Sequence, residues 1–403
     1  MKLFNTFLLS ANCQVNYDRD VRACTQSTSY VGPDNFQYDL KNVLRTATPV
    51  PEATEMKLNF GRVPEWINGH WFRTGPGIYE FGDDEYMGLA DPLAIWSRIT
   101  FDQGSVTFKS DFQYGSHHTR NAEVGSIMFP EMSTWGNPAD CDAENDPDNS
   151  KLIEFLTEDP DFVSDNNYVS YWAVGGGLYA SGETYFVWQI DPITLKGVRK
   201  INLSELFQET VFKNNRKYNA KIGHTRCTSL ATHLAHYHYD KVTDEYFGAF
   251  TCMTDGFVPG IEYVFYKIPD AFQGLKSKPE TPEEVWGRAV IIGQVPSKHN
   301  SAMHLDFGQE YFHDFAITEN YIIFGTTGIL IDFLKMPELM ITRTPLAYGA
   351  AFYEEAECSW YVMDRKSGEI KEYPTTPFFA THVMNAFEQE VKKSFFNWLE
   401  VPN

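Results

Sequence analysis

The sequence is poor in cysteine and in positive charge. Its six cysteines are scattered without a Cys-x-x-Cys pair, so neither a thiolate zinc site nor a dense disulfide framework is expected, and free thiols in a reducing compartment are predicted. Lys and Arg number 33 against 54 Asp and Glu, which gives a formal net charge of -21. Such a surface repels phosphate backbones and anionic headgroups, which argues against nucleic-acid binding and electrostatic membrane docking.

Long apolar runs are also lacking. No stretch approaches the length of a membrane-spanning helix. Residues 1–11, a lysine followed by a short apolar run, resemble a minimal secretory signal, but Asn5 and Thr6 interrupt the run. A cytoplasmic protein is therefore expected, with secretion as the alternative. Contact with a membrane through an apolar patch stays open.

Helical periodicity is nearly absent, and short β-branched and aromatic runs broken by turn residues take its place. With 43% hydrophobic and 15% aromatic residues, the chain has ample material for a packed core, so disorder of its bulk is not expected. One element recurs, a strand followed by an Asp-led turn and another strand, at 100–106, 189–195, 238–246 and 362–370. Asp closes such turns by bonding its own backbone two residues on. The pattern predicts an all-β protein of repeated antiparallel hairpins, and a β-propeller suits it better than a sandwich.

Three segments are predicted to be peripheral. Residues 1–37 carry no strand pattern and form an N-terminal extension. Residues 138–149 form an acidic loop without the carboxylate spacing of an EF-hand. Residues 270–286 are predicted to be a surface excursion between strands.

Among eleven histidines, three places have an imidazole flanked by aromatic or aliphatic residues. His236 and His238 follow a predicted strand, His313 precedes one, and His382 lies near the C-terminal end. Imidazole nitrogens without thiolates suit iron or copper better than a structural zinc site. From the residues alone, however, three packed core histidines explain the pattern as well as a metal site does.

Several long motifs in order resemble the carotenoid cleavage oxygenases, with the closest resemblance to the animal branch of β-carotene oxygenases and retinal isomerohydrolase. Residues 236–240, His-Tyr-His-Tyr-Asp, are similar to the family's His-Pro-His-Tyr-Asp. Residues 311–324 resemble its Tyr-His-Ser-Phe-Gly-x-Thr-Glu-Asn-Tyr-x-x-Phe motif, and residues 379–388 its Phe-His-x-x-Asn-Ala-x-Glu motif. Upstream, residues 61–69 and 72–77 match the family's opening strand.

This resemblance implies a seven-bladed β-propeller with ferrous iron, Fe(2+), held on its axis by four histidines. Residue by residue, His236, His313 and His382 would be the first three metal ligands. Glu183 matches a glutamate that orients a ligand imidazole through its other N–H. His238 would be a neighbour, and His233 is a weaker competitor for the first ligand position.

The resemblance covers residues 38–388, and 389–403 are interpreted as a divergent C-terminal tail. A fourth histidine and the closing blades have no counterpart, so an incomplete propeller of a C-terminally truncated family member is expected. The acidic loop around Cys141 replaces a membrane-associated segment of animal members, which leaves membrane association open.

The preferred function is iron-dependent dioxygenase cleavage of a carbon–carbon double bond of a carotenoid or apocarotenoid, with dioxygen, to aldehydes. Two alternatives are kept. One is a non-catalytic member that binds a carotenoid or retinoid, and the other is a β-propeller interaction scaffold whose histidines are merely packed.

Overall fold

The computed structural model describes residues 44–136, 163–214, 227–254, 260–301, 306–332, Lys335, Leu339 and 344–389. The predicted extension at 1–37, the acidic loop and the tail from 390 onward lie outside these residues. Every strand pair with a defined register is antiparallel, which confirms the predicted all-β class.

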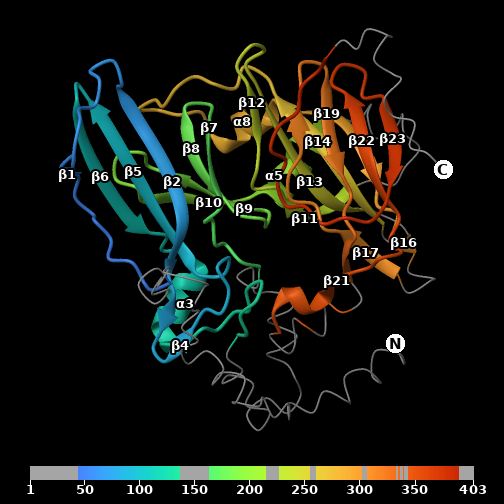
Figure 1. Cartoon of the computed structure of the whole chain (residues 1–403), viewed down its shortest axis with the longest axis horizontal. Helices are drawn as coiled ribbons and strands as arrows, with labels where there is room; N and C mark the ends of the chain where they lie inside the picture. Colours follow the sequence, from blue (N-terminus) through green and yellow to red (C-terminus); the bar gives the residue numbers. More distant parts are fainter. Residues whose placement is uncertain are drawn as a thin grey trace. The chain divides into compact units, whose positions relative to one another are not determined.

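The described chain divides into two compact units. The first unit comprises residues 1–171, 178–200 and 333–349, and the second comprises residues 172–177, 201–332 and 350–403. Figure 1 labels many of the strands of both units.

The first unit contains a four-stranded sheet of order β1-β6-β5-β2 and most of a second sheet of order β10-β9-β8-β7. A short hairpin, β3-β4, and helix α3 accompany them. The bounds are β1 Thr54–Glu55, β2 Gly69–Ile78, β3 Glu80–Phe81, β4 Asp84–Glu85, β5 Leu93–Asp102, β6 Ser105–Phe112, α3 Ser116–Val124, β7 Ser170–Val174, β8 Gly177–Ser181, β9 Phe186–Ile190, β10 Gly197–Asn202 and the 3-10 helix η5 Leu346–Gly349.

The second unit contains three sheets, of orders β11-β13-β14-β15 with β12 on β13, β16-β17-β20-β21, and β18-β19-β22-β23. Its helices are α5 Leu203–Glu209, α6 Val211–Asn214 and α8 Pro282–Gly287. Its strands are β11 Cys227–His233, β12 His238–Asp240, β13 Glu245–Thr254, β14 Ile261–Ile268, β15 Val290–Pro296, β16 Asn300–Ser301, β17 Asp306–Glu310, β18 Ala316–Ile317, β19 Tyr321–Gly325, β20 Ile329–Asp332, β21 Ala350–Phe352, β22 Cys358–Asp364 and β23 Ile370–Thr375.

The four Asp-led turns join the strand pairs β5-β6, β9-β10, β12-β13 and β22-β23, as predicted. Asp364 accepts hydrogen bonds from the backbone N–H of Lys366 at 2.9 Å and of Ser367 at 2.7 Å. Asp191 accepts the corresponding two bonds in the β9-β10 turn. In these two turns a short polar side chain supplies the acceptor that closes the hairpin, and Asp240 does the same for Val242 N–H at 2.9 Å in the β12-β13 turn.

Residues 270–286 were predicted to be a surface excursion, but they include helix α8. Its capping box joins Thr281 and Glu284, and Pro282 stands at its start, so the sequence has a strong helix start signal there. Val285 and Trp286 are fully buried and anchor the helix in the second unit.

An aromatic-rich core fills the second unit and reaches the segment that carries His313. Its buried members come from two sheets and from the segments between strands, namely Leu234, Phe247, Ala249, Tyr263, Phe265, Ile292, Val295, Phe312, Phe315, Ile322, Phe324, Tyr361 and Met363. Close-packed interiors leave side chains little room to move, so the buried neighbours of His313 hold the backbone on either side of it.

The prediction of free thiols is wrong for one pair, since Cys227 and Cys252 form a disulfide. The two residues lie on the neighbouring strands β11 and β13, and a separation of 25 residues gives no local spacing signal. Tertiary pairing alone brings them together. Within the described residues, Cys358 remains a free, buried thiol.

Glu262 lies directly opposite Cys252 in the β13-β14 pair, on the same face of the sheet as the disulfide. Its side chain is 4% exposed, and its Oε2 atom has no hydrogen-bond partner within the described part of the chain. Burial raises the pKa of this carboxyl to about 7. Between about pH 4.5 and about pH 7, Glu262 is therefore protonated in the folded protein but ionised in the unfolded chain.

We expect removal of the disulfide to lower the free energy of unfolding. Closing a loop of this length restricts the unfolded chain, and the double variant Cys227→Ser/Cys252→Ser should lose about 3 kcal/mol. Urea unfolding with and without dithiothreitol measures this. The reductant should destabilise the parent and leave the double variant unchanged, and an equal response of both would show that the disulfide contributes nothing.

We expect Glu262 to make the protein less stable as pH rises. Its folded pKa lies above its unfolded value, so the free energy of unfolding falls by roughly 2–4 kcal/mol between about pH 4.5 and about pH 7. Above about pH 7 this contribution no longer changes. In Glu262→Gln this contribution should vanish, which makes the variant more stable than the parent at pH 7 but not at pH 4.5. Denaturant titrations across that range test it, and parallel pH profiles would contradict the assignment.

Candidate metal centre

Three segments between strands carry the candidate ligands, all in the second unit. His236 lies between β11 and β12, and the backbone just before it is anchored because Leu234 N–H donates to the Ala249 carbonyl and Trp172 Nε1–H to the Ala235 carbonyl. His313 lies between β17 and β18, flanked by buried Phe312 and Phe315. His382 follows β23 in a segment without regular structure.

The three imidazoles meet at their Nε2 atoms. The nitrogen–nitrogen distances are 2.9 Å from His236 to His313, 3.1 Å from His313 to His382 and 3.1 Å from His382 to His236. The rings stand edge to face, with interplanar angles of 72° to 76°. Among the described residues, this is the group of histidine, cysteine or carboxylate side chains that could hold a metal ion.

Hydrogen bonding among the rings cannot satisfy this triangle. A ring nitrogen carries either a proton or a lone pair, so at least one of the three nitrogen pairs faces like against like. A cation that accepts all three lone pairs removes that conflict. The donor set, three neutral imidazoles without a thiolate, suits iron, copper or zinc.

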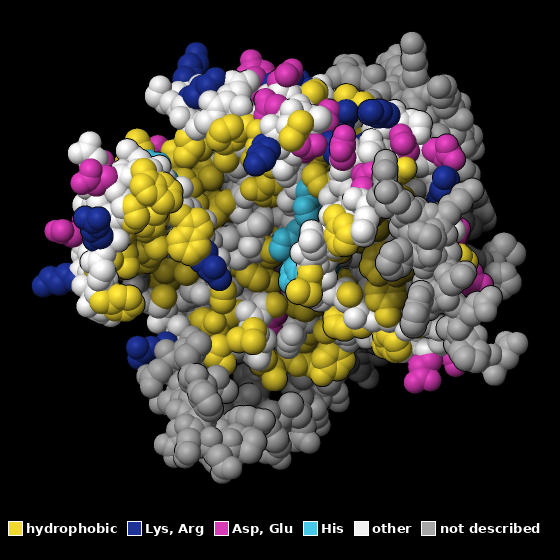
Figure 2. Space-filling model, turned by 45° about the horizontal axis from the view of Figure 1, so that its top comes forward, with side chains coloured by type: hydrophobic (Ala, Val, Ile, Leu, Met, Phe, Trp, Pro, Cys, Tyr) yellow, Lys and Arg dark blue, Asp and Glu magenta, His cyan; other side chains and the backbone are white. Residues whose placement is uncertain are grey.

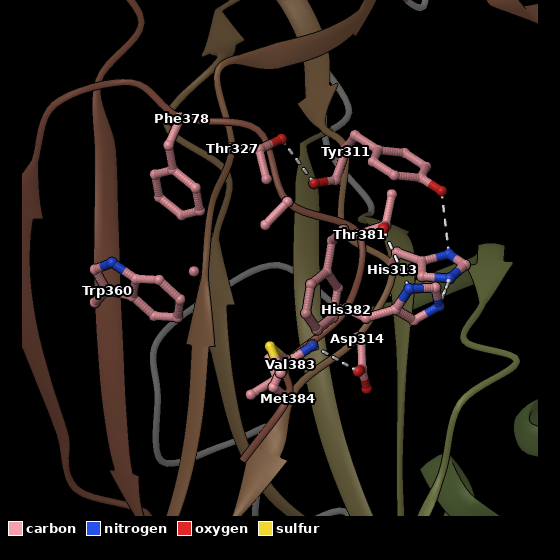
Figure 3. A pocket seen from close by; sticks show the side chains of 13 residues that line it. Tyr311, His313, Asp314, Thr327, Trp360, Phe378, Thr381, His382, Val383 and Met384 are labelled. Atoms are coloured by element: carbon pink, nitrogen blue, oxygen red, sulfur yellow. Dashed lines mark hydrogen bonds between the residues drawn. The ribbon is translucent and has the colours of Figure 1, made fainter. Parts of the chain in front are cut away.

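Hydroxyl groups contact the opposite nitrogens of two rings. The Tyr311 hydroxyl lies 3.1 Å from His313 Nδ1, and the Thr381 hydroxyl lies 3.2 Å from His382 Nδ1 (Figure 3). A hydroxyl that accepts from Nδ1–H keeps the proton there and leaves Nε2 as a lone pair. Both contacts therefore favour the tautomer that a metal ligand needs.

Carboxylates hold the segment that carries His382 against the segment that carries His313. Asp314 accepts a hydrogen bond from Val383 N–H at 3.0 Å. Glu388 accepts from the Thr318 hydroxyl at 2.6 Å and from the Asn320 backbone and side chain at 2.8 and 2.9 Å. These donors hold the pKa of Glu388 below its usual range. Both carboxylates thus hold the chain just after His382, which is itself exposed.

The structure separates His233 from the other candidates. It is fully buried, 2.8 Å from the Tyr266 hydroxyl and packed on Trp172, and burial lowers its pKa to about 3. It is therefore a neutral core histidine outside the triangle. His238 lies beside the site and contacts Asp314 at 3.3 Å. Glu183 lies between β8 and β9 in the first unit, and its role as an orienting residue stays a prediction.

Sequence reasoning missed the residues that hold the histidines, above all Asp314, Tyr311 and Glu388. Only their place inside the two histidine motifs could have indicated them. Their contacts depend on which segments meet in space, which the motifs do not state.

A pocket of about 220 Å³ opens beside His313 and His382. In Figure 3 the stacked rings of Trp360 and Phe378 lie on one side of it and the imidazoles on the other, with Met384 near its floor. Such an apolar and aromatic lining suits an uncharged, elongated ligand. Pockets for whole small molecules are usually larger, about 300–1,000 Å³, so this one would hold only part of such a ligand. In Figure 2 histidine side chains reach the surface of the molecule.

Comparison with known proteins places the chain in a family. The profile of the retinal pigment epithelial membrane protein (RPE65) family matches residues 44–401, so the chain belongs to this family of RPE65 and carotenoid oxygenases. The match includes most of the segment from 389 onward that the motifs did not reach.

Curated relatives are similar at low identity. Rat β,β-carotene 15,15'-dioxygenase is 27% identical over 333 residues, which cover 82% of this chain and 52% of the relative. The mitochondrial carotenoid-cleaving dioxygenase of Macaca fascicularis is 26% identical over 351 residues, 86% of this chain and 56% of the relative. Carotenoid isomerooxygenase of Galleria mellonella is 25% identical over 332 residues, which cover 82% of this chain and 56% of the relative. The chain thus spans about half the length of the curated relatives it matches.

Solved structures share the fold. An ACO/RPE65 chimera aligns with a TM-score of 0.57 and 18% identity, over 86% of this chain and 60% of that chain. Cobalt-substituted Synechocystis ACO aligns with a TM-score of 0.57 and 17% identity over the same shares. Within the described ranges, no helix is both long and apolar enough to cross a membrane.

We expect Glu388 to stabilise the protein above pH 4.5 and to lose this effect in acid. Its folded pKa is depressed, so the contribution is present above the unfolded value and disappears as pH falls through the folded value. Glu388→Gln should therefore melt at a lower temperature than the parent at pH 7, with the gap closing towards pH 3. Calorimetry at both pH values tests this, with Glu369→Gln as the control on the same unit, and a gap that persists at pH 3 would contradict it.

Proposed function

We propose that this chain is an iron-dependent oxygenase that cleaves a carbon–carbon double bond of a carotenoid or apocarotenoid to aldehydes. The observation that carries the proposal is the triangle of His236, His313 and His382, whose Nε2 atoms lie 2.9 to 3.1 Å apart. Support comes from the family and from relatives named as carotene dioxygenases and a carotenoid isomerooxygenase. A neighbour described as cobalt-substituted is consistent with a metal in this fold.

The three histidines would hold ferrous iron, which supplies binding and activation of dioxygen when present. The protein's own part is to fix the imidazoles. Where the Tyr311 and Thr381 hydroxyls accept from Nδ1–H, no proton has to leave Nε2 before the metal binds. Glu183, by resemblance, would orient one further ring N–H.

The aromatic pocket would hold one end of the polyene. Trp360 and Phe378 stack at 5.2 Å between ring centroids, and their faces offer apolar contact to a flat conjugated chain. A polyene carries no charge and no hydrogen-bonding group along its length, so shape and apolar contact must position it. Because the pocket ends beside His313 and His382, a bound chain would present a bond near the imidazoles.

The remaining parts of the proposal follow from the family alone. The antiparallel sheets described above would be blades of a seven-bladed propeller. Dioxygen would be the second substrate. The isomerooxygenase among the relatives leaves room for isomerisation at the same site.

We expect the purified chain to bind about one ferrous ion after anaerobic reconstitution and desalting. The triple variant His236→Ala/His313→Ala/His382→Ala should retain almost none, because all three lone pairs are gone, while the exposed His70→Ala should match the parent. Elemental analysis measures the iron, and chromatography of aldehydes released from β-carotene measures the reaction.

The outcomes separate the functions. Equal iron in the parent and the triple variant would refute the proposed centre and favour a scaffold. Iron at the centre together with bound but uncleaved β-carotene would favour a binding protein over an oxygenase.

A further inference from the structure

Asp314 occupies a buried position next to the candidate ligand His313. Its side chain is only 8% exposed, and it accepts hydrogen bonds from Val383 N–H at 3.0 Å and from its own neighbour Phe315 N–H at 2.8 Å. His238 Nε2 lies 3.3 Å from the same carboxylate.

The partners of this carboxylate belong to the other two ligand segments. His238 stands two residues after His236, and Val383 stands directly after His382. Asp314 itself directly follows His313. One carboxylate is therefore bonded to all three segments that bring imidazoles to the candidate centre.

We propose that Asp314 is the positioning residue that sets the three ligand segments in register, and so determines how tightly the centre holds its metal. This inference rests on the proposed function, because it concerns the same centre. It assigns no chemical step to Asp314, which contacts His238 and not the imidazoles of the triangle.

A carboxyl group suits this task because its two oxygens can serve partners from two directions. Asp314 uses both, since Oδ1 faces His238 and Oδ2 faces Val383. The family motif quoted above has serine at this place, and a single, shorter hydroxyl could not reach both partners.

Position matters because the triangle is small. Its edges are about 3 Å, and the segment that carries His382 has no strand or helix hydrogen bonds of its own. Without the Val383 bond, the nearest anchors would be Phe378, whose carbonyl accepts from Gly328 N–H four residues before His382, and Glu388, six residues after it. The His382 ring would then sample positions that do not suit a shared ion.

The test measures cobalt(II) alone, by its visible absorption and by its dissociation constant, in the full-length chain. Asp314→Ser and the milder Asp314→Asn should weaken cobalt binding about 10–100-fold and change the spectrum, because the ligand geometry relaxes. Asp364→Ser is the matched control, since Asp364 also accepts two backbone N–H groups in the same unit but in a turn without ligands. It should bind cobalt like the parent.

A second readout does not depend on the metal. Hydrogen exchange of the Val383 amide should be slower in the metal-free parent than in Asp314→Ser, and Asp364→Ser should match the parent. His238→Ala should add little to the loss of cobalt affinity in Asp314→Ser, because both remove the same link.

Each outcome is decisive. Unchanged cobalt affinity and spectrum in both Asp314 variants would overturn the inference, with the metal centre intact. A parent that binds no cobalt would overturn the proposed function instead, and Val383 exchange would then decide whether Asp314 holds the segment. Equal exchange in the parent and Asp314→Ser would show that it does not.

Discussion

The close approach of three imidazole nitrogens is the constraint on which the rest of the site depends. Three imidazole nitrogens converge only if the backbone holds the rings in place. For His236 and His313, buried neighbouring residues fix that backbone. Leu234 and Ala235 fix the approach to His236, and Phe312 and Phe315 fix the backbone on either side of His313. The hydrophobic effect thus supplies the rigidity that a polar, partly exposed centre cannot supply for itself.

The third candidate ligand is held mainly by hydrogen bonds. The segment around His382 has no strand or helix, and its place is set by bonds to Asp314 and Glu388 and by the bond from Gly328 N–H to the Phe378 carbonyl. Packing adds the stacking of Phe378 on Trp360. Polar anchors of this kind are directional, so they fix a segment without a strand or a large apolar surface. The proposed centre therefore combines two segments positioned by the core with one positioned mainly by hydrogen bonds.

The sequence predicted what depends on local chemistry. Asp at the hairpin turns specifies these turns within a few residues, and the structure has them where expected. The motifs also indicated His236, His313 and His382, which the structure brings together. What escaped prediction depends on partners far apart in sequence. Three features form only after distant segments come together: the Cys227–Cys252 bond, the burial of Glu262 and the link from Asp314 to Val383. The capping box of α8, in contrast, is a local signal that the sequence already contains.

The spread of the three histidines along the chain has a consequence for how the protein matures. His236 and His382 are 146 residues apart, and several sheets of the second unit lie between them in sequence. A partly folded chain can offer one or two imidazoles but not the triangle, so an ion at the proposed centre would have high affinity only for the finished unit. By linkage, a metal that prefers the native state draws the folding equilibrium towards it. If the proposed centre binds a metal, the supply of that metal during synthesis would favour correctly folded chains. Chains that complete the second unit would retain the ion, and misfolded chains would release it.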